Sequence, residues 1–289
     1  MTLFDTFIHN LNKVIPSTVV ALIFYIWTLQ SHSMQQGQKT KSAGKFQYLD
    51  QGEGTPIIVL HGLMGGLSNF CAVADHFSRR NYRVIIPILP LYDLPLLKTT
   101  VKALAQYINE FIKHLELKDV ILLGNSLGGH IGLLHVKLFS SNAKALVITG
   151  SSGLYENSLG DSYPKRGDYE YIKKKAEEVF YDPEVATKEL IDEVFELVND
   201  RCKLVKTLAI AKSAIRHNMA KDLPKFKTPT CIIWGKNDKV TPPEVAEEFH
   251  KLLPDSELFW VDKCGHAPMM EHPEEFNRLL ESWLKKRQL

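Results

Sequence analysis

The stretch Val120-Ile121-Leu122-Leu123-Gly124-Asn125-Ser126-Leu127-Gly128-Gly129 decides the fold of this 289-residue chain. The apolar run before Gly124 predicts a buried strand, and the periodicity after Ser126 predicts a helix over residues 127–140. The pattern G-x-S-x-G between them is typical of a tight turn that holds the serine Oγ above the end of the strand. Glycines two residues to either side leave room for neighbouring backbone. Ser126 is therefore a candidate nucleophile, and Asn125 beside it is a candidate substrate contact.

On both sides of this motif, short apolar runs alternate with longer amphipathic runs. This alternation is typical of βα units around a mostly parallel sheet. Strands are predicted over residues 46–50, 57–61, 83–87, 120–124, 145–149, 230–234 and 257–261. Helices are predicted over residues 67–80, 98–115, 127–140, 243–253 and 273–286.

One long stretch breaks the alternation. Residues 153–224 show helical periodicity and no convincing strand, so we expect a helical lid inserted before the strand that precedes Asp238. Residues 34–152 and 225–289 would then form the α/β core. Nothing repeats at a fixed period of the kind that marks solenoids or propellers.

Residues 1–33 form a separate apolar extension, with nine consecutive apolar residues from Val19 to Trp27. This run is short of the ~20 residues that a membrane-spanning helix needs. Three interpretations stay open: a signal or anchor, a segment that precedes a true start at Met34, and an interfacial helix. We expect a cytoplasmic protein if translation starts at Met34, and otherwise an exported or membrane-anchored one, with membrane association only if residues 1–33 are retained.

Composition excludes several classes of function. The chain has 35 Lys and Arg against 33 Asp and Glu, a net charge of +2, so it lacks the basic excess of a nucleic-acid binder. With 45% hydrophobic and 24% charged residues, it has the composition of a folded globule. The four cysteines form no C-x-x-C pair and are expected to be buried and free, although one disulfide stays open for an exported chain.

A nucleophilic serine needs a base and an acid, and the next two predicted strands supply them. Asp238 follows the strand over residues 230–234, and His266 follows the strand over residues 257–261. We expect His266 to take the proton of Ser126 while Asp238 orients the imidazole. The chain order Ser, Asp, His is the one that such a nucleophile turn predicts.

The backbone N–H groups of Leu63 and Leu127 are the expected oxyanion hole, because both follow strands that end near Ser126. Met64 lies in the same loop as Leu63 and is a candidate substrate contact. The remaining candidate substrate contacts are Tyr155, Phe195 and Met219, together with Met269 and Met270 after His266.

Taken together, these motifs resemble those of the α/β-hydrolase superfamily, in its lidded serine hydrolase branch of carboxylesterases and meta-cleavage product hydrolases. The resemblance covers about residues 46–287. It rests on His61-Gly62, the 124–129 motif, Trp234-Gly235-x-x-Asp238-x-x-Thr241-Pro242, and Gly265-His266 followed by Glu271-His272-Pro273. It implies an eight-stranded sheet with an additional early hairpin, neither a metal nor an organic cofactor, and acyl transfer through an ester of Ser126.

Two departures from that pattern favour a plain ester substrate. The carbon–carbon hydrolases of the superfamily usually carry an Arg on the lid that binds the substrate carboxylate, and Val194 stands in its place. They also tend to have Trp after the catalytic Gly-His, where this chain has Ala267. The leading hypothesis is a carboxylesterase for small-molecule esters with short- to medium-chain apolar groups. The alternatives are a carbon–carbon hydrolase, with Arg201 or Arg216 in the Arg's role, and a non-catalytic binding protein. Oligomeric state stays open.

Overall fold

The computed structural model describes residues 40–139, 143–155 and 165–289. The predictions about residues 1–33 lie outside this part of the chain. Residues Lys41–Leu289 form one compact unit. None of its described helices combines the length and the apolar character that crossing a membrane requires.

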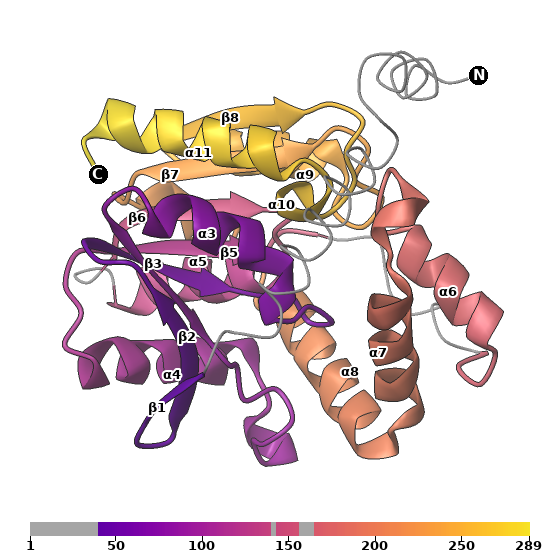
Figure 1. Ribbon diagram of the computed structural model, residues 1–289. Helices are drawn as coiled ribbons and strands as arrows, with labels where there is room; N and C mark the ends of the chain where they lie inside the picture. Colours follow the sequence, from indigo (N-terminus) through magenta and orange to yellow (C-terminus); the bar gives the residue numbers. More distant parts are fainter. Residues whose placement is uncertain (1–39, 140–142, 156–164) are drawn as a thin grey trace, which may run out of the picture. The chain divides into compact units, whose positions relative to one another are not determined.

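Eight strands form one sheet in the order β1-β2-β4-β3-β5-β6-β7-β8 (Figure 1). Their bounds are β1 Lys41–Ala43, β2 Phe46–Gln51, β3 Thr55–Leu60, β4 Tyr82–Pro87, β5 Val120–Asn125, β6 Ala143–Thr149, β7 Thr230–Gly235 and β8 Ser256–Val261. The pairs β1–β2 and β2–β4 are antiparallel, and the others are parallel. All seven predicted strands are present, and β1 completes the early hairpin, so the predicted α/β-hydrolase sheet is confirmed.

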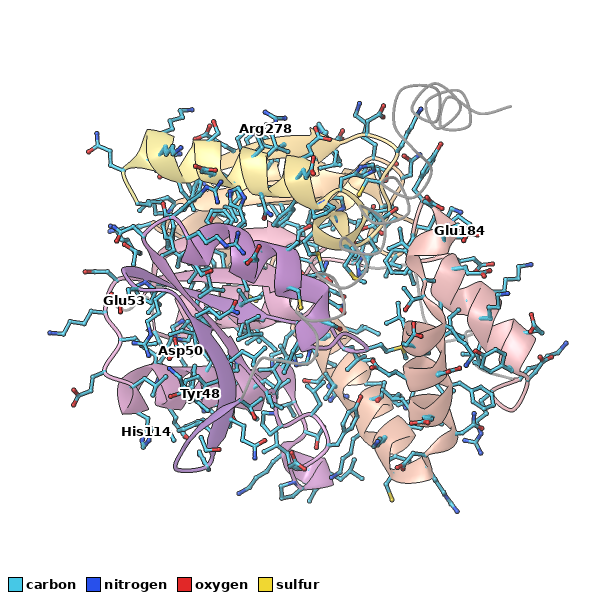
Figure 2. The ribbon with its side chains drawn as sticks, viewed as in Figure 1. Tyr48, Asp50, Glu53, His114, Glu184 and Arg278 are labelled. Carbon is cyan, nitrogen blue, oxygen red and sulfur yellow. The ribbon has the colours of Figure 1, made fainter. Side chains whose placement is uncertain are left out.

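The early hairpin is anchored by β2, on which Figure 2 labels Tyr48 and Asp50. The ring of Tyr48 packs edge-on against Phe111, with centroids 5.3 Å apart. The carboxylate of Asp50 accepts two hydrogen bonds of 2.9 Å from the Arg83 guanidinium on β4 and one of 2.9 Å from Lys41 on β1. One side chain thus ties together three adjacent strands.

Helices cover both faces of the sheet (Figure 1). α4 (Val101–His114), α5 (Leu127–Phe139) and α9 (Pro243–Leu252) pack on one face, and α3 (Cys71–Ser78) and α11 (Pro273–Arg287) pack on the other. The central strands are fully buried as a result, which explains their continuous runs of Ile, Val and Leu. The predicted helix over residues 67–80 begins instead as a 3-10 turn at Leu67–Phe70 before α3.

Among the described residues between β6 and β7 there are three α-helices, which we call the helical insertion: α6 (Tyr169–Glu177), α7 (Lys188–Asn199) and α8 (Arg201–Arg216). The start of each is fixed by an N-cap residue whose side chain accepts a backbone N–H, namely Asp168, Thr187 and Asp200. Such caps satisfy donors that the helix itself leaves unpaired. Within residues 165–224 the structure has no strand, as the periodicity predicts.

Candidate functional site

Ser126 lies at the turn between β5 and α5, with a φ of +54°. The turn is held by the backbone: Ser126 N donates to Thr149 O at 3.1 Å, and Ser126 O accepts from His130 and Ser152 at 3.2 Å. A Cβ at Gly128 would lie 1.9 Å from the backbone oxygen of Leu60. Only glycine permits this close approach of α5 to β3, and the strained serine conformation depends on it.

His266 and Asp238 form a buried pair at the same edge of the sheet. Asp238 follows β7, His266 follows β8, and the His266 Nδ1 atom lies 2.8 Å from Asp238 Oδ2. Because a carboxylate only accepts, Nδ1 carries a proton and Nε2 of a neutral His266 is an acceptor. This is the tautomer that a base acting on Ser126 requires.

The Asp238 carboxylate is fixed by three further donors. Oδ1 accepts from the backbone N–H groups of Val240 and Thr241 at 2.8 and 2.9 Å, and Oδ2 accepts from the Thr241 hydroxyl at 2.8 Å. The Trp234 indole N–H donates to Thr241 O at 2.9 Å. Thr241 therefore sets the orientation of the carboxylate that His266 meets. The sequence carries this signal in the Thr241-Pro242 pair that follows Asp238.

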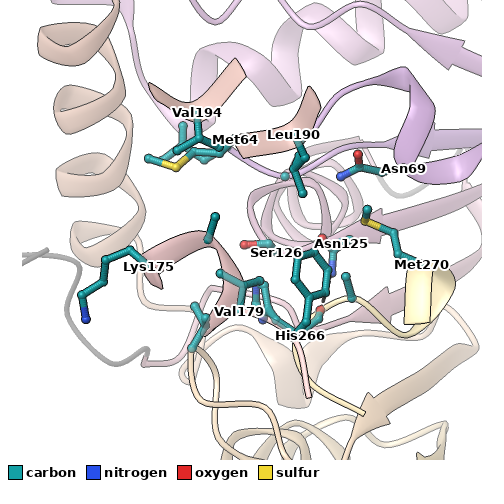
Figure 3. Close-up of a pocket in the computed structure, with 17 residues that line it drawn as sticks. Met64, Asn69, Asn125, Ser126, Lys175, Val179, Leu190, Val194, His266 and Met270 are labelled. Atoms are coloured by element: carbon teal, nitrogen blue, oxygen red, sulfur yellow. Dashed lines mark hydrogen bonds between the residues drawn. The ribbon is translucent and has the colours of Figure 1, made fainter. Parts of the chain in front are cut away.

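Ser126, Asn125 and His266 line a cavity of about 170 Å³ (Figure 3). The rest of its lining is mostly apolar. It comes from the loop and the 3-10 turn after β3, from α6 and the residues that follow it, from α7, from the loop after β7 and from the residues after His266. These residues are Gly62, Leu63, Met64, Gly65, Asn69, Lys175, Ala176, Val179, Phe180, Leu190, Val194, Val240, Ala267 and Met270.

Lys175 is the only Lys or Arg, and no Asp or Glu is present, among the described residues that line this cavity. Its ammonium donates to Glu178 at 2.7 Å, and Figure 3 shows it directed away from Ser126. The pocket wall therefore receives the aliphatic stem of Lys175 rather than its charge.

Several predicted site residues meet at this pocket. Leu63 and Met64 line it, and Leu127 is the first residue of α5, so its N–H belongs to the helix N-terminus that points at Ser126. Asn125 lines the pocket too, but its Nδ2 donates to Thr149 O and to His266 O, both at 3.0 Å. The Asn125 side chain thus ties the serine turn to the histidine loop.

Four predicted substrate contacts lie elsewhere. Tyr155 is 47% exposed, whereas Met219 and Met269 are buried in the two cores that cover the sheet. Phe195 packs within the helical insertion, with its ring 5.2 Å from that of Tyr169. None of the four is among the described residues that line the cavity.

The place of Phe195 follows from helical geometry. On α7, Leu190 and Val194 are one turn apart and face the cavity, so Phe195 points to a different side. Of the two candidate methionines after His266, Met270 is in the described lining and Met269 is not. Arg201 and Arg216 lie at the two ends of α8, and neither is in the described lining.

Asn69, Val179 and Phe180 also line the cavity. Asn69 lies in the 3-10 turn before α3, and Val179 and Phe180 follow the end of α6, so no strand or α-helix periodicity predicts where they point.

Other titratable groups near the sheet edge play structural roles. The ring of His61 is buried and its Nδ1 lies 2.8 Å from Gly62 O, and burial lowers the pKa of His61. Burial raises the pKa of the Cys264 thiol. All four cysteines are free. No group of three or more His, Cys, Asp or Glu side chains in the described part of the chain could hold a metal ion.

The sheet order, the serine turn and the histidine–aspartate pair together define an α/β hydrolase. The model of the alpha/beta hydrolase family matches residues 57–279, and the chain belongs to this family.

Similar proteins carry several activities. The chain is 29% identical over 271 residues to a 2-hydroxy-6-oxo-6-(2'-aminophenyl)hexa-2,4-dienoic acid hydrolase from Metapseudomonas resinovorans, which covers 83% of this chain and 88% of that protein. It is 23% identical to Lipase 1 from Psychrobacter immobilis, over 81% of this chain and 78% of that protein. Among solved structures, an alpha/beta hydrolase enzyme from a sediment metagenome of the lagoon of Mar Chica, Morocco, is 59% identical with a TM-score of 0.73. The match covers 87% of this chain and 100% of the metagenome protein.

Proposed function

We propose that the protein hydrolyses carboxylic esters with short- to medium-chain apolar groups, with Ser126 as the nucleophile. The observation that carries this proposal is that Ser126 and the Asp238-bound His266 line one apolar cavity. An esterase from Exiguobacterium antarcticum, 26% identical with a TM-score of 0.72 over 86% of this chain and 99% of that one, supports the assignment.

In the proposed reaction, Ser126 Oγ attacks the ester carbonyl while His266 Nε2 takes the hydroxyl proton. The carbonyl oxygen becomes an anion that the backbone N–H groups of Leu63 and Leu127 stabilise, at about 3 kcal/mol for each such donor. The ester C–O bond then breaks, and the alcohol leaves with the proton from His266. Water attacks the acyl-Ser126 ester by the same route, which releases the acid and restores the serine.

The size and polarity of the cavity support the substrate class. Its volume of about 170 Å³ is close to that of an apolar cavity of roughly 150 Å³ that takes up benzene. We therefore expect the best acyl groups to carry about four to six carbon atoms. The proposed substrate is uncharged in this region, because no described Lys or Arg of the cavity lining directs its charge inward.

The second candidate is carbon–carbon bond hydrolysis, favoured by the named activity of the Metapseudomonas relative and by Asn125 before the nucleophile. It requires a group that binds the substrate carboxylate. Val194 lines the cavity where the Arg of such hydrolases would stand, and Arg201 and Arg216 lie outside the described lining. These placements favour the ester.

The test is the initial rate on p-nitrophenyl esters from acetate to palmitate, for wild type beside Ser126→Ala. We expect serine-dependent turnover with an optimum at short chains. Turnover that survives Ser126→Ala would refute the assignment of the nucleophile. An absence of ester turnover combined with cleavage of a dienoate diketone would establish the second candidate, and inactivity on both would favour a non-catalytic binding protein.

A further inference from the structure

The Glu271 side chain bridges two segments that come together at the catalytic centre. Glu271 is the last residue of the short helix α10 (Pro268–Glu271). Its Oε1 atom accepts the backbone N–H of Gly265 at 2.7 Å, and its Oε2 atom accepts that of Tyr181 at 2.7 Å. Gly265 directly precedes His266, whereas Tyr181 follows α6 of the helical insertion.

These two segments also touch directly. The backbone N–H of His266 donates to Val179 O at 2.9 Å. A Cβ at Gly265 would lie 2.5 Å from the same Val179 oxygen and 2.9 Å from Phe180 backbone atoms. Val179 and Phe180 line the cavity, so the wall against which a substrate packs is continuous with the backbone that carries the histidine.

We propose that Glu271 is a positioning residue that locks the pocket wall of Val179 and Phe180 to the His266 loop, and so sets the place of the imidazole relative to bound substrate. This inference rests on the proposed function. Hydrogen bonds from N–H groups to a carboxylate are roughly twice as strong as neutral ones, and two oxygens on one planar group fix the spacing between two chains. The hydrogen bond between His266 N–H and Val179 O joins the two segments at one point. The two bonds to Glu271 add further restraints, so that one segment cannot shift along the other.

If Glu271 has this role, the size of the substrate affects the rate of the chemical step. A substrate group that fills the cavity contacts Val179 and Phe180 and limits their movement. Because Glu271 binds this segment and Gly265 together, the position of the His266 imidazole is limited as well. Loss of the bridge should leave binding to the apolar wall intact but misplace the base, and a small misplacement of a reacting group has a large cost in rate. The expected signature is a fall in kcat with little change in KM.

The experiment compares Glu271→Ala, Glu271→Gln and the matched control Glu275→Ala, which removes a carboxylate that pairs on the surface with Arg278 at 3.6 Å. Backbone hydrogen exchange is followed by mass spectrometry in peptides that cover residues 179–182 and 264–266. Hydrolysis of p-nitrophenyl butyrate gives kcat and KM. Glu271→Gln keeps the size of the side chain and serves as the test if Glu271→Ala does not fold.

We expect exchange to rise in both peptides of Glu271→Ala, and kcat to fall about tenfold or more with KM nearly unchanged. Glu271→Gln keeps one acceptor oxygen and should recover part of the loss, and Glu275→Ala should match wild type. Faster exchange in only one peptide or in neither would overturn the bridge, and unchanged kcat with faster exchange in both would overturn the positioning role. The exchange readout does not require ester turnover, so a failure of the proposed function is recognised separately.

Discussion

Val194 offers the most direct test of how the pocket selects its substrate. Its side chain lines the cavity from α7, beside Met64 (Figure 3). Replacement by Phe places a ring in a space of about 170 Å³, which is room for roughly one benzene-sized group. We expect Val194→Phe to fill the acyl site while leaving Ser126 and His266 in place.

The magnitude follows from the acyl groups that lose their site. Hexanoate carries four more methylene groups than acetate, and each buried methylene is worth about 0.8 kcal/mol. If the site were completely blocked, the preference for hexanoate over acetate would fall by about 3 kcal/mol. This is roughly a 200-fold change in the ratio of their kcat/KM values. Partial blockage should give a change of at least tenfold, and Val194→Ala should move the optimum toward longer chains.

The assay is release of p-nitrophenolate from the acetate, butyrate and hexanoate esters. Val205→Phe is the matched control, because Val205 is 43% exposed on α8 and lies outside the described cavity lining. If Val194→Phe lowered acetate and hexanoate hydrolysis equally, or left their ratio at the wild-type value, the cavity would not be the acyl site.

Three further outcomes follow from the same structure. Gly128→Ala should lower the free energy of unfolding in urea by more than about 3 kcal/mol, because its Cβ would lie 1.9 Å from a backbone oxygen of β3. Gly66→Ala is the control and should change this free energy little, because its Cβ has no contact under 3.8 Å. Burial lowers the pKa of His135 to about 4 from 6.5. Below pH 6.5 the unfolded chain therefore binds a proton at His135 that the folded chain does not bind, and the stability that the protein has above pH 6.5 falls as the pH is lowered. His135→Leu should remove about 2 kcal/mol of the loss in urea stability between pH 7 and pH 5, and an undiminished loss would contradict the assignment. Asp238→Asn should lower kcat by about 10³–10⁴-fold at pH 7 with the fold intact by circular dichroism, because His266 loses its anionic acceptor; a loss under tenfold would exclude the role.

The parts of the fold that the sequence predicts are those encoded locally. Strands buried on both faces need continuous apolar runs, and the turn at Ser126 needs small residues where α5 meets β3. Both demands act on neighbouring residues and are therefore visible in a single sequence. The chemistry at the sheet edge was predictable for the same reason, because Asp238 and His266 follow recognisable strands.

The pocket wall was predicted less well because it depends on how separate helices face each other. The spacing of α7 predicts an amphipathic helix but does not decide whether Val194 or Phe195 meets the cavity. The same holds for Met269 and Met270, of which one is core and the other is pocket. Only the placement of the helical insertion against the sheet settles which neighbour points inward.

This division has a consequence for how substrate choice changes among such chains. The proposed nucleophile, acid and base are Ser126, Asp238 and His266, and each follows the end of a strand. Part of the wall comes from α6 and α7, which supply Lys175 and Val194. We expect that a change of side chain at position 194, or of the direction of the Lys175 ammonium, alters which substrate is bound without moving the reacting groups. Glu271 is the point at which these two layers meet, because its carboxylate holds the wall segment and the histidine loop at once. Variation in the insertion that keeps this bridge can alter specificity alone, whereas variation that breaks it must also alter the rate of the chemical step.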